Sequence, residues 1–441
     1  LCDDREGGLW VGTNNDPARV LWRSAATVFD HQTGVITDAR ATDLERHRGT
    51  LYYLSNDGLY RLAPSADSRV PAHFERDPRV DVQTKLSSLL SHPGGLLLAG
   101  GRGLQRLGNN GLELLTPKPD GLIGLSASKT EPARVFFAHS RGVGTGTFAA
   151  DGTWRDEGDI PGIDGECYDA IEDADGTLWV GTISKGVFRA TRSPGAADWR
   201  NATVTQLTTA EDLPGGHGAI YLCDTSLGVL FDTAHGIYRF DRASGRCVFY
   251  RELTAFDARP LVLNPLVRGA PGELWTNGLA TDIKTKESPY PLVRLRARPD
   301  GSFAAESPPP EIQDFFSPQP PHRIVWEPGT GGGPGVLWAK GDNGLLRIDL
   351  ARYDATAPAV APLVRQVSAE GRELVIPRDA PGDLRLGYSR EPLTIGWVSG
   401  LFRRGESERF QTRLVGFNDA WTAATARNDI AFTNLEGGPF R

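Results

Sequence analysis

The chain has 441 residues, of which 39% are hydrophobic, with 52 glycines, 31 prolines and a formal net charge of −7. This acidic balance comes without a basic stripe, which argues against nucleic acid or an anionic membrane surface as a partner. No apolar run approaches the roughly 20 residues that a membrane-spanning helix needs, and no secretory signal opens the chain. The composition suits an all-β protein with many turns.

A ten-residue motif recurs along the chain. It is nearly whole at Asp4–Thr13 (DREGGLWVGT) and at Asp173–Thr182 (DADGTLWVGT). The units share an apolar or aromatic pair, at Leu9-Trp10, Leu51-Tyr52, Leu96-Leu97, Val135-Phe136, Leu178-Trp179, Leu230-Phe231, Leu274-Trp275 and Leu337-Trp338. Four short alternating strands in a unit of roughly 40–50 residues match the size of a propeller blade. We therefore predict a seven- or eight-bladed β-propeller, in which the eight units are eight blades or seven blades and a remnant, with few helices.

Within each unit the recurring residues have structural roles. We expect the Asp and Gly of the motif to form a tight hairpin and the Trp, or its substitute, to pack against a neighbouring blade. Arginines recur at a matched position after the second strand of five units. They are expected to pack their stems and pair locally between blades rather than bind a ligand; they are Arg61, Arg106, Arg189, Arg239 and Arg347.

Metal and cofactor motifs are missing from the sequence. The four cysteines form no Cys-x-x-Cys pair, so we expect free, buried thiols. The eight histidines lack metal-ligand spacing; they are His31, His47, His73, His92, His139, His217, His235 and His322. We predict neither a metal site nor a cofactor.

The texture changes after a short Pro/Ala linker that begins near Asp354. We place the propeller at residues 1–356 and a small immunoglobulin-like β-sandwich at residues 357–441. Its expected strands are Leu363–Val367, Glu373–Ile376, Leu384–Tyr388, Leu393–Val398, Phe410–Leu414 and Ala431–Asn434, with Trp421 buried. Because the chain opens inside a repeat and the sandwich stops one or two strands short of closure, we expect a piece of a longer protein.

Two motifs together resemble a known family. The repeat resembles the two-component regulator propeller repeat. The segment Phe410–Trp421 and the following Thr433-Asn434-Leu435 resemble the triple-tyrosine (Y_Y_Y) domain that follows such propellers, although Phe410 and Thr412 replace both tyrosines. This chain also has eight units where the family usually has about fourteen, and a degenerate fourth unit.

The resemblance implies an extracytoplasmic, periplasmic sensing region of a membrane-anchored signalling protein. Its implied ligand is a small molecule such as an oligosaccharide, and its implied partner is a second copy bound through the C-terminal sandwich. A membrane helix and a histidine kinase or diguanylate cyclase are implied outside this chain, so we expect no enzyme activity here.

Two alternatives stay open. The repeat also resembles the Asp-box of propeller hydrolases, and a carbohydrate-active hydrolase or lyase needs two carboxylates facing one cavity. Asp169 with Glu172, or Glu211 with Asp212, are the pairs to consider. A pure protein-interaction propeller is the other alternative.

Ligand-binding residues are sought in the non-repeating loops that lead into the innermost strands, because loops on a rigid scaffold carry function. Aromatic faces and planar hydrogen-bonding groups suit a sugar. The candidates are Tyr168, His217, Arg259, Phe316, Gln319 and His322.

Overall fold

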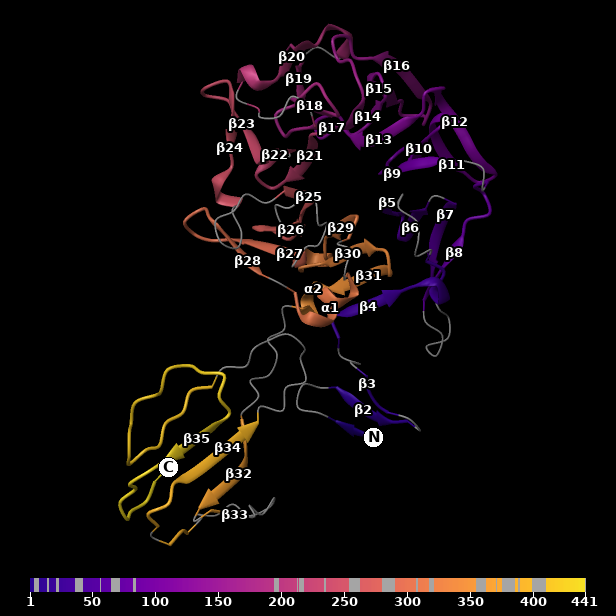
Figure 1. The fold of residues 1–441 in the computed structure, drawn as a ribbon. Helices are drawn as coiled ribbons and strands as arrows, with labels where there is room; N and C mark the ends of the chain where they lie inside the picture. Colours follow the sequence, from indigo (N-terminus) through magenta and orange to yellow (C-terminus); the bar gives the residue numbers. More distant parts are fainter. Residues whose placement is uncertain are drawn as a thin grey trace. The chain divides into compact units, whose positions relative to one another are not determined.

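A ring of antiparallel sheets forms the larger part of the computed structural model (Figure 1). The chain divides into two compact units, Ala25–Tyr353 and a second one that combines Leu1–Ser24 with Asp354–Arg441. The structure describes residues 1–3, 8–13, 16–20, 24–35, 43–55, 57–64, 72–81, 85–193, 198–211, 213, 218–233, 235–253, 262–279, 290–306, 308–316, 321–353, 362–369, 371–374, 385–387, 389–398 and 410–440.

Seven four-stranded sheets, the blades, are described within Ala25–Tyr353. The first three blades contain β5 (Asp43–His47), β6 (Thr50–Ser55), β7 (Gly58–Ala63) and β8 (His73–Arg76); β9 (Leu86–His92), β10 (Gly95–Gly100), β11 (Gly103–Gly108) and β12 (Gly111–Pro117); and β13 (Leu122–Ala127), β14 (Arg134–His139), β15 (Gly142–Phe148) and β16 (Trp154–Asp159). The next three contain β17 (Cys167–Glu172), β18 (Leu178–Thr182), β19 (Val187–Thr191) and β20 (Thr203–Leu207); β21 (Tyr221–Thr225), β22 (Gly228–Thr233), β23 (Gly236–Asp241) and β24 (Arg246–Phe249); and β25 (Val262–Arg268), β26 (Glu273–Leu279), β27 (Tyr290–Ala297) and β28 (Phe303–Glu306).

The seventh blade closes the ring by joining the two ends of this unit. It contains β29 (Arg323–Glu327), β30 (Val336–Gly341), β31 (Gly344–Asp349) and, as its fourth strand, the early segment β4 (Ala26–Phe29). In Figure 1, β4 lies beside β31. A strand from the start of the unit therefore completes the sheet at its end, which covers an edge that would otherwise be open.

The cores lie between blades, which explains the alternation in the motif. Each of the seven clusters of buried hydrophobic residues combines two neighbouring blades, including the seventh and the first. In β18, Leu178 and Val180 pack toward the third blade, whereas Trp179 packs toward the fifth. Because successive strand residues point to opposite faces, one Leu-Trp-Val run serves both neighbours. The expected inter-blade role of the Trp is confirmed.

The blade number is seven, one of the two values predicted. The first repeat, around Leu9-Trp10, forms a separate three-stranded sheet of β1 (Cys2–Asp3), β2 (Leu9–Gly12) and β3 (Pro17–Val20). The compact unit that forms the propeller therefore begins at Ala25, whereas the prediction from the sequence assigned residues 1–356 to the propeller.

Helices are few in the described part of the chain, as expected. They are α1 (Pro310–Phe315), α2 (Leu350–Tyr353) and the single-turn 3-10 segments η1 (His31–Thr33), η2 (Trp199–Asn201), η3 (Thr209–Glu211), η4 (Arg251–Leu253) and η5 (Thr330–Gly332). Among the residues that the structure describes, no helix has the length and apolar character to cross a membrane.

The recurring arginines pack locally, which confirms their structural role. The Arg106 guanidinium lies 2.7 Å from the Glu113 carboxylate and 5.7 Å from the ring centre of Phe148 in the next blade. Arg189 similarly lies 5.0 Å from the ring centre of Phe240 in the next blade. Three of the four cysteines are buried and Cys2 is exposed, and none of the four forms a disulfide.

The C-terminal part contains one described four-stranded sheet. Its order is β33 (Arg372–Leu374), β32 (Leu363–Ala369), β34 (Leu393–Val398) and β35 (Asp429–Phe432). A second layer of the predicted sandwich has no strand among the described residues.

Three predictions about this part are wrong. Phe410–Leu414 makes only isolated bridges, to Thr425 and Asn418, instead of a strand. The described residues of Leu384–Tyr388 are not a strand. Trp421 is 60% exposed, with the Arg413 guanidinium 4.9 Å from its ring centre, because no described sheet covers it.

Candidate ligand-binding site

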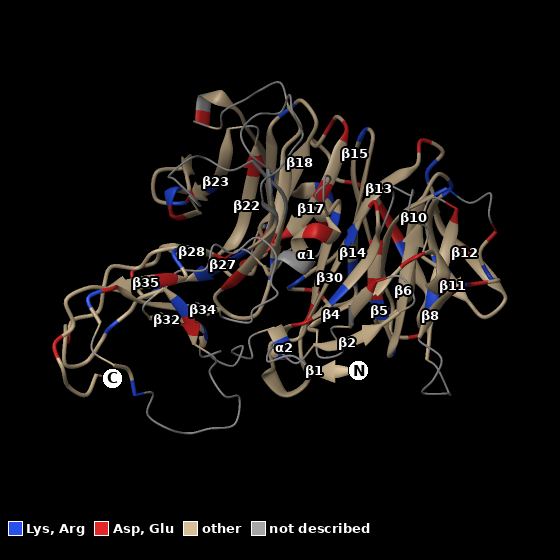
Figure 2. Ribbon diagram, turned by 60° about the horizontal axis from the view of Figure 1, so that its bottom comes forward, with Lys and Arg blue, Asp and Glu red and all other residues tan. Residues whose placement is uncertain are grey.

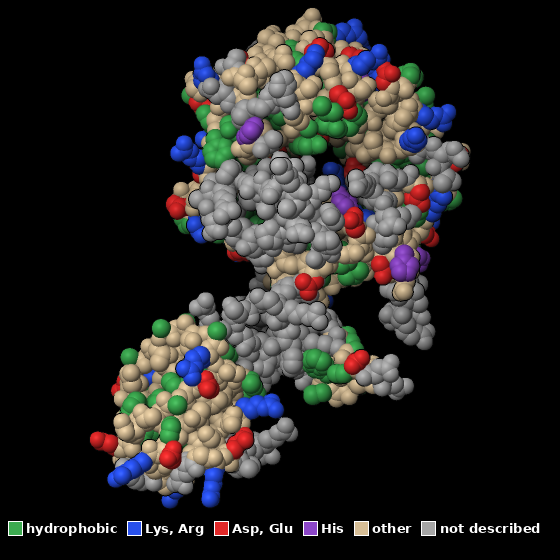
Figure 3. Space-filling model, viewed as in Figure 1, with side chains coloured by type: hydrophobic (Ala, Val, Ile, Leu, Met, Phe, Trp, Pro, Cys, Tyr) green, Lys and Arg blue, Asp and Glu red, His purple; other side chains and the backbone are tan. Residues whose placement is uncertain are grey.

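The first strand of every blade contributes to the centre of the ring. Neighbouring first strands contact one another from β5 through β9, β13, β17, β21 and β25 to β29. Figure 3 shows the face of the ring hollowed at its centre, with basic, acidic and histidine side chains at the edge of the hollow. We call this region, where the first strands begin, the channel mouth.

Polar side chains on the first strands bond to the first strand of the following blade. The Leu89 N–H donates to Asp43 Oδ2 at 2.8 Å, and Ser87 Oγ donates to the Leu122 carbonyl at 2.6 Å. The Leu222 N–H likewise donates to Asp169 Oδ2 at 3.3 Å. These contacts satisfy backbone groups on the free edge of each inner strand, which would otherwise lack partners.

Two ion pairs join the seventh blade to the first. Arg323 Nη2 lies 2.6 Å from Asp43 Oδ1, and Arg46 Nε lies 2.8 Å from Glu327 Oε1. The Asp43 side chain is 6% exposed, whereas the Arg323 side chain is 45% exposed. Arg323 is thus anchored at one end of its guanidinium and open to the channel at the rest.

Glu45 lies at the seam between the first and seventh blades, and its carboxyl has a raised pKa. Burial raises the pKa of the Glu45 carboxyl to about 7, and the Asp43 and Glu327 carboxylates add to the rise while Arg323 opposes it. A carboxyl with this pKa titrates near neutral pH. Elsewhere on the propeller, acidic and basic positions are intermingled (Figure 2).

Across the channel, two tyrosines form a stacked pair. The rings of Tyr168 on β17 and Tyr221 on β21 have centroids 5.4 Å apart and planes inclined by 25°. Asp169 is their neighbour, and its carboxylate interacts electrostatically with Arg323, which comes from the seventh blade. Burial raises the pKa of Asp169, while the Leu222 N–H and the Arg323 charge act in the opposite direction.

Of the six predicted ligand residues, two lie at this mouth. They are Tyr168 and His322, whose Nε2 lies 3.0 Å from Asp342 Oδ1 beside the first residue of β29. Phe316 is 1% exposed in the core between the sixth and seventh blades, so its ring has no free face and its assignment is corrected. His217, Arg259 and Gln319 lie outside the described residues.

The sequence did not single out Asp43, Arg323 or Tyr221. Asp43 and Arg323, like Asp169, lie two residues before the one that pairs with the aromatic position of the second strand. This shared register position is the sequence feature that could have identified Asp43 and Arg323. Tyr221 lies one residue later in its strand, so only its proximity to Tyr168 identifies it.

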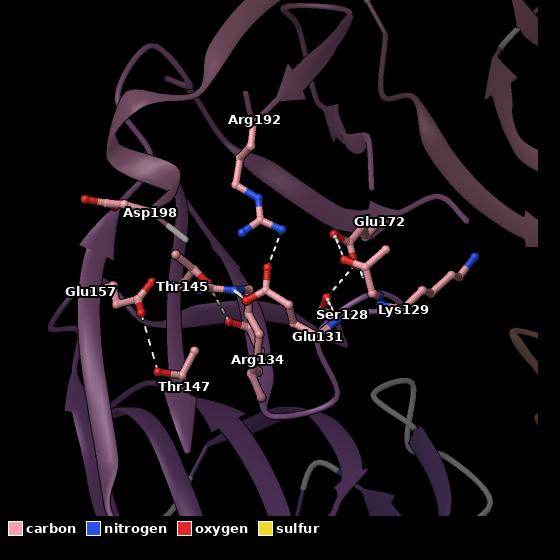
Figure 4. Close-up of polar contacts among 12 residues, drawn as sticks. Ser128, Lys129, Glu131, Arg134, Thr145, Thr147, Glu157, Glu172, Arg192 and Asp198 are labelled. Carbon is pink, nitrogen blue, oxygen red and sulfur yellow. Dashed lines mark hydrogen bonds and ion pairs between the residues drawn. The ribbon is translucent and has the colours of Figure 1, made fainter. Parts of the chain in front are cut away.

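Neither candidate catalytic pair brings two described carboxylates to one cavity. Glu172 is fully buried and accepts hydrogen bonds from the loop of the third blade (Figure 4). Asp169 accepts one from the fifth blade, so the two carboxylates contact opposite neighbours. Glu211 accepts the Thr208 N–H at 2.8 Å within its own turn. Asp212 lies outside the described residues. No group of three potential metal ligands occurs among the described residues.

The fold and its hollow mouth define the class of this chain as a seven-bladed β-propeller followed by a smaller β unit. No family model matches the chain, and no curated protein matches it.

Solved structures do match. The extracellular domain of BT3049 from B. thetaiotaomicron, described as a hybrid two component system, has a TM-score of 0.58 at 11% identity and covers 100% of this chain. The extracellular domain of BT4673 from the same organism has TM-scores of 0.53 and 0.52 in two structures, at 15% identity and 100% coverage. It is described once as a hybrid two component system and once as a one component system. The chain spans 57–59% of these domains, and the likeness confirms the fold expected from the repeat.

Proposed function

We propose that this chain is the extracytoplasmic, periplasmic ligand-sensing region of a membrane-anchored two-component histidine kinase or diguanylate cyclase. The observation that carries the proposal is the channel mouth, where Arg323, Glu45, Asp169 and the Tyr168–Tyr221 pair converge from separate blades. Small-molecule sites are usually hollows lined by aromatic and charged groups that still have free hydrogen-bonding capacity. The domains with the same fold, named above, lend support because they are extracellular domains.

The proposed ligand is a small molecule such as an oligosaccharide. The stacked tyrosines offer apolar faces, and Arg323 and Asp169 offer a donor and an acceptor on opposite sides of the mouth. Binding would shift the relative positions of blades at the seam between the first and seventh, and the C-terminal unit would pass this shift on within a homodimer.

A thermal-shift screen of glycans and other small molecules tests the proposal. A binder should raise the melting temperature, and Arg323→Gln should weaken the effect at least tenfold in ligand concentration. Arg141→Gln is the matched control, because Arg141 forms an exposed ion pair with Asp120 on the rim. Hydrolysis of a panel member without stabilisation would favour the enzyme, and a stable protein partner without any ligand effect would favour the interaction propeller; either result overturns the proposal.

A further inference from the structure

We propose that the side of the channel mouth formed by the fourth and fifth blades binds an organic cation, with an ammonium group against the Asp169 carboxylate and the Tyr168 and Tyr221 rings as the adjoining wall. This inference rests on the proposed sensing function and names the charge of the ligand.

The wall is built by two neighbouring first strands in close contact. Tyr168 and Tyr221 are both partly exposed, and their rings stack at 5.4 Å. A Cβ added to Gly124 would lie 2.4 Å from the Tyr168 carbonyl oxygen, so the backbone of β13 reaches directly against this tyrosine. The rings are therefore held by strands rather than by loops, which favours a preorganised surface.

The polar groups of this wall have unfilled hydrogen-bonding capacity. The one hydrogen bond that reaches the Asp169 carboxylate from described residues is the 3.3 Å contact with the Leu222 N–H. The phenol hydroxyls of both tyrosines make none with the described part of the chain, whereas the hydroxyl of Tyr60 donates to Asp57 at 2.7 Å. Asp169 is partly exposed, so the part of its carboxylate that the described residues leave unbonded is open to a ligand.

The charge balance favours a cation as that partner. Arg323 is the positive group that acts on Asp169, and it is already bound to Asp43 at 2.6 Å. An anionic ligand would meet the Asp169, Asp43 and Glu45 carboxylates. An ammonium group would instead offset the charge of Asp169 and gain cation–π attraction from the tyrosine faces. A neutral polyol would gain neither term.

The titratable and charged groups around Asp169 also shape its behaviour without ligand. They are Arg323, Tyr168, Tyr221 and the buried thiol of Cys223. Because burial dominates and raises the pKa of Asp169, ionisation of this carboxyl destabilises the fold as pH rises through that pKa. Asp169→Asn should therefore raise the melting temperature at pH 8 and leave it unchanged at pH 3, although it removes the ligand's counter-charge.

Calorimetric titration at pH 7 with three probes tests the inference. Glucosamine carries the ammonium group, N-acetylglucosamine has the same ring with the amine blocked, and tetramethylammonium is a cation without a sugar. We expect glucosamine to bind at least tenfold more tightly than N-acetylglucosamine, tetramethylammonium to bind, and Asp169→Asn to weaken both cations at least tenfold. Asp156→Asn is the matched control, since Asp156 also accepts a single backbone N–H, from Gly158 at 2.8 Å, but on the exposed rim.

A second variant tests the wall. Tyr221→Leu should weaken both cations several-fold while the melting temperature stays within a few degrees. Equal binding of glucosamine and N-acetylglucosamine, no effect of Asp169→Asn, or no binding of either cation at millimolar concentration would each overturn the inference. Neutral glycans that bind independently of Asp169 would leave the sensing function in place. If the cations bind but no ligand of the wider panel used above has an effect, the cation site stands and the proposed sensing function fails.

Discussion

Glu172→Ala should destabilise the propeller far more than an ordinary surface carboxylate would. The Glu172 carboxylate is 0% exposed and accepts four hydrogen bonds from the β13–β14 loop of the neighbouring blade (Figure 4). The donors are Ser128 Oγ at 2.5 Å, the Lys129 N–H at 2.7 Å, the Thr130 N–H at 3.1 Å and Thr130 Oγ1 at 2.9 Å. The side chain thus binds the fourth blade to the third.

The magnitude follows from the donors that lose their acceptor. An N–H that loses its acceptor costs about 1–3 kcal/mol where it is shielded from water, and the part-buried backbone N–H groups of Lys129 and Thr130 are affected. The two hydroxyls can rotate toward other acceptors, so they add little. We expect a loss of about 3–5 kcal/mol for Glu172→Ala, and about half of that for Glu172→Gln, whose carbonyl oxygen still accepts.

Urea unfolding followed by tryptophan fluorescence measures the loss, because Trp199 lies in the core between these two blades. The matched control is Glu113→Ala, in which an exposed carboxylate loses its ion pair with Arg106 and about 1 kcal/mol or less. A loss below 1 kcal/mol for Glu172→Ala, or one equal to that of the control, would refute the reasoning.

Three further predictions concern closure, charge and backbone contact. Phe29→Ala should lower the free energy of unfolding in urea by about 3–4 kcal/mol, because Phe29 is 5% exposed between the first and seventh blades. The control Val28→Ala, at a residue on the same strand that is 47% exposed, should lower it by less than about 0.5 kcal/mol. Equal losses would contradict the closure of the ring by β4. Since the folded pKa of Glu45 is about 7, above its value in the unfolded chain, stability falls as pH rises from about 4.5 to 7. Glu45→Gln should therefore stabilise by about 1–2 kcal/mol at pH 8 and not at pH 4, in urea midpoints at both values, and a gain at both would exclude titration as the cause. Gly181→Ala should lower the melting temperature by several degrees, because the added Cβ would lie 2.4 Å from the Ile220 carbonyl oxygen. Gly218→Ala should leave the melting temperature unchanged, because the space around Gly218 is open. Tolerance of both substitutions would contradict the close contact between the strands.

The architecture was predictable because the residues of the repeat are those that pack between neighbouring blades. Leu178, Trp179 and Val180 must alternate between two neighbouring blades, so the same pattern recurs wherever a second strand forms. What the pattern could not reveal was where the ring closes. β4 carries no copy of the motif, and its pairing with β31 joins segments more than 300 residues apart. Choosing between seven and eight blades therefore required the structure.

The C-terminal part shows the opposite outcome. There the sequence offered hydrophobic residues without a repeat, and Trp421 and Phe417 turn out 60% and 50% exposed. An aromatic residue followed by a turn is compatible with either a core or a surface position, since only a covering sheet distinguishes them. The strand Leu393–Val398, which alternates cleanly, was placed with its observed bounds.

The site was only partly predictable because polar residues on the first strands do two different jobs. Asp43 is satisfied by Leu89, Ser88 and Arg323, so its main role is to hold blades together. Asp169 occupies the same register position but accepts a single long hydrogen bond from the described residues, that of the Leu222 N–H. Sequence spacing makes the two equivalent, and only the count of filled hydrogen bonds separates the structural carboxylate from the one left open to a ligand. The same criterion excludes Glu172, whose four donors fill its carboxylate, and it favours Asp169, whose carboxylate is left mostly open by the described residues, as the place where this propeller is expected to bind.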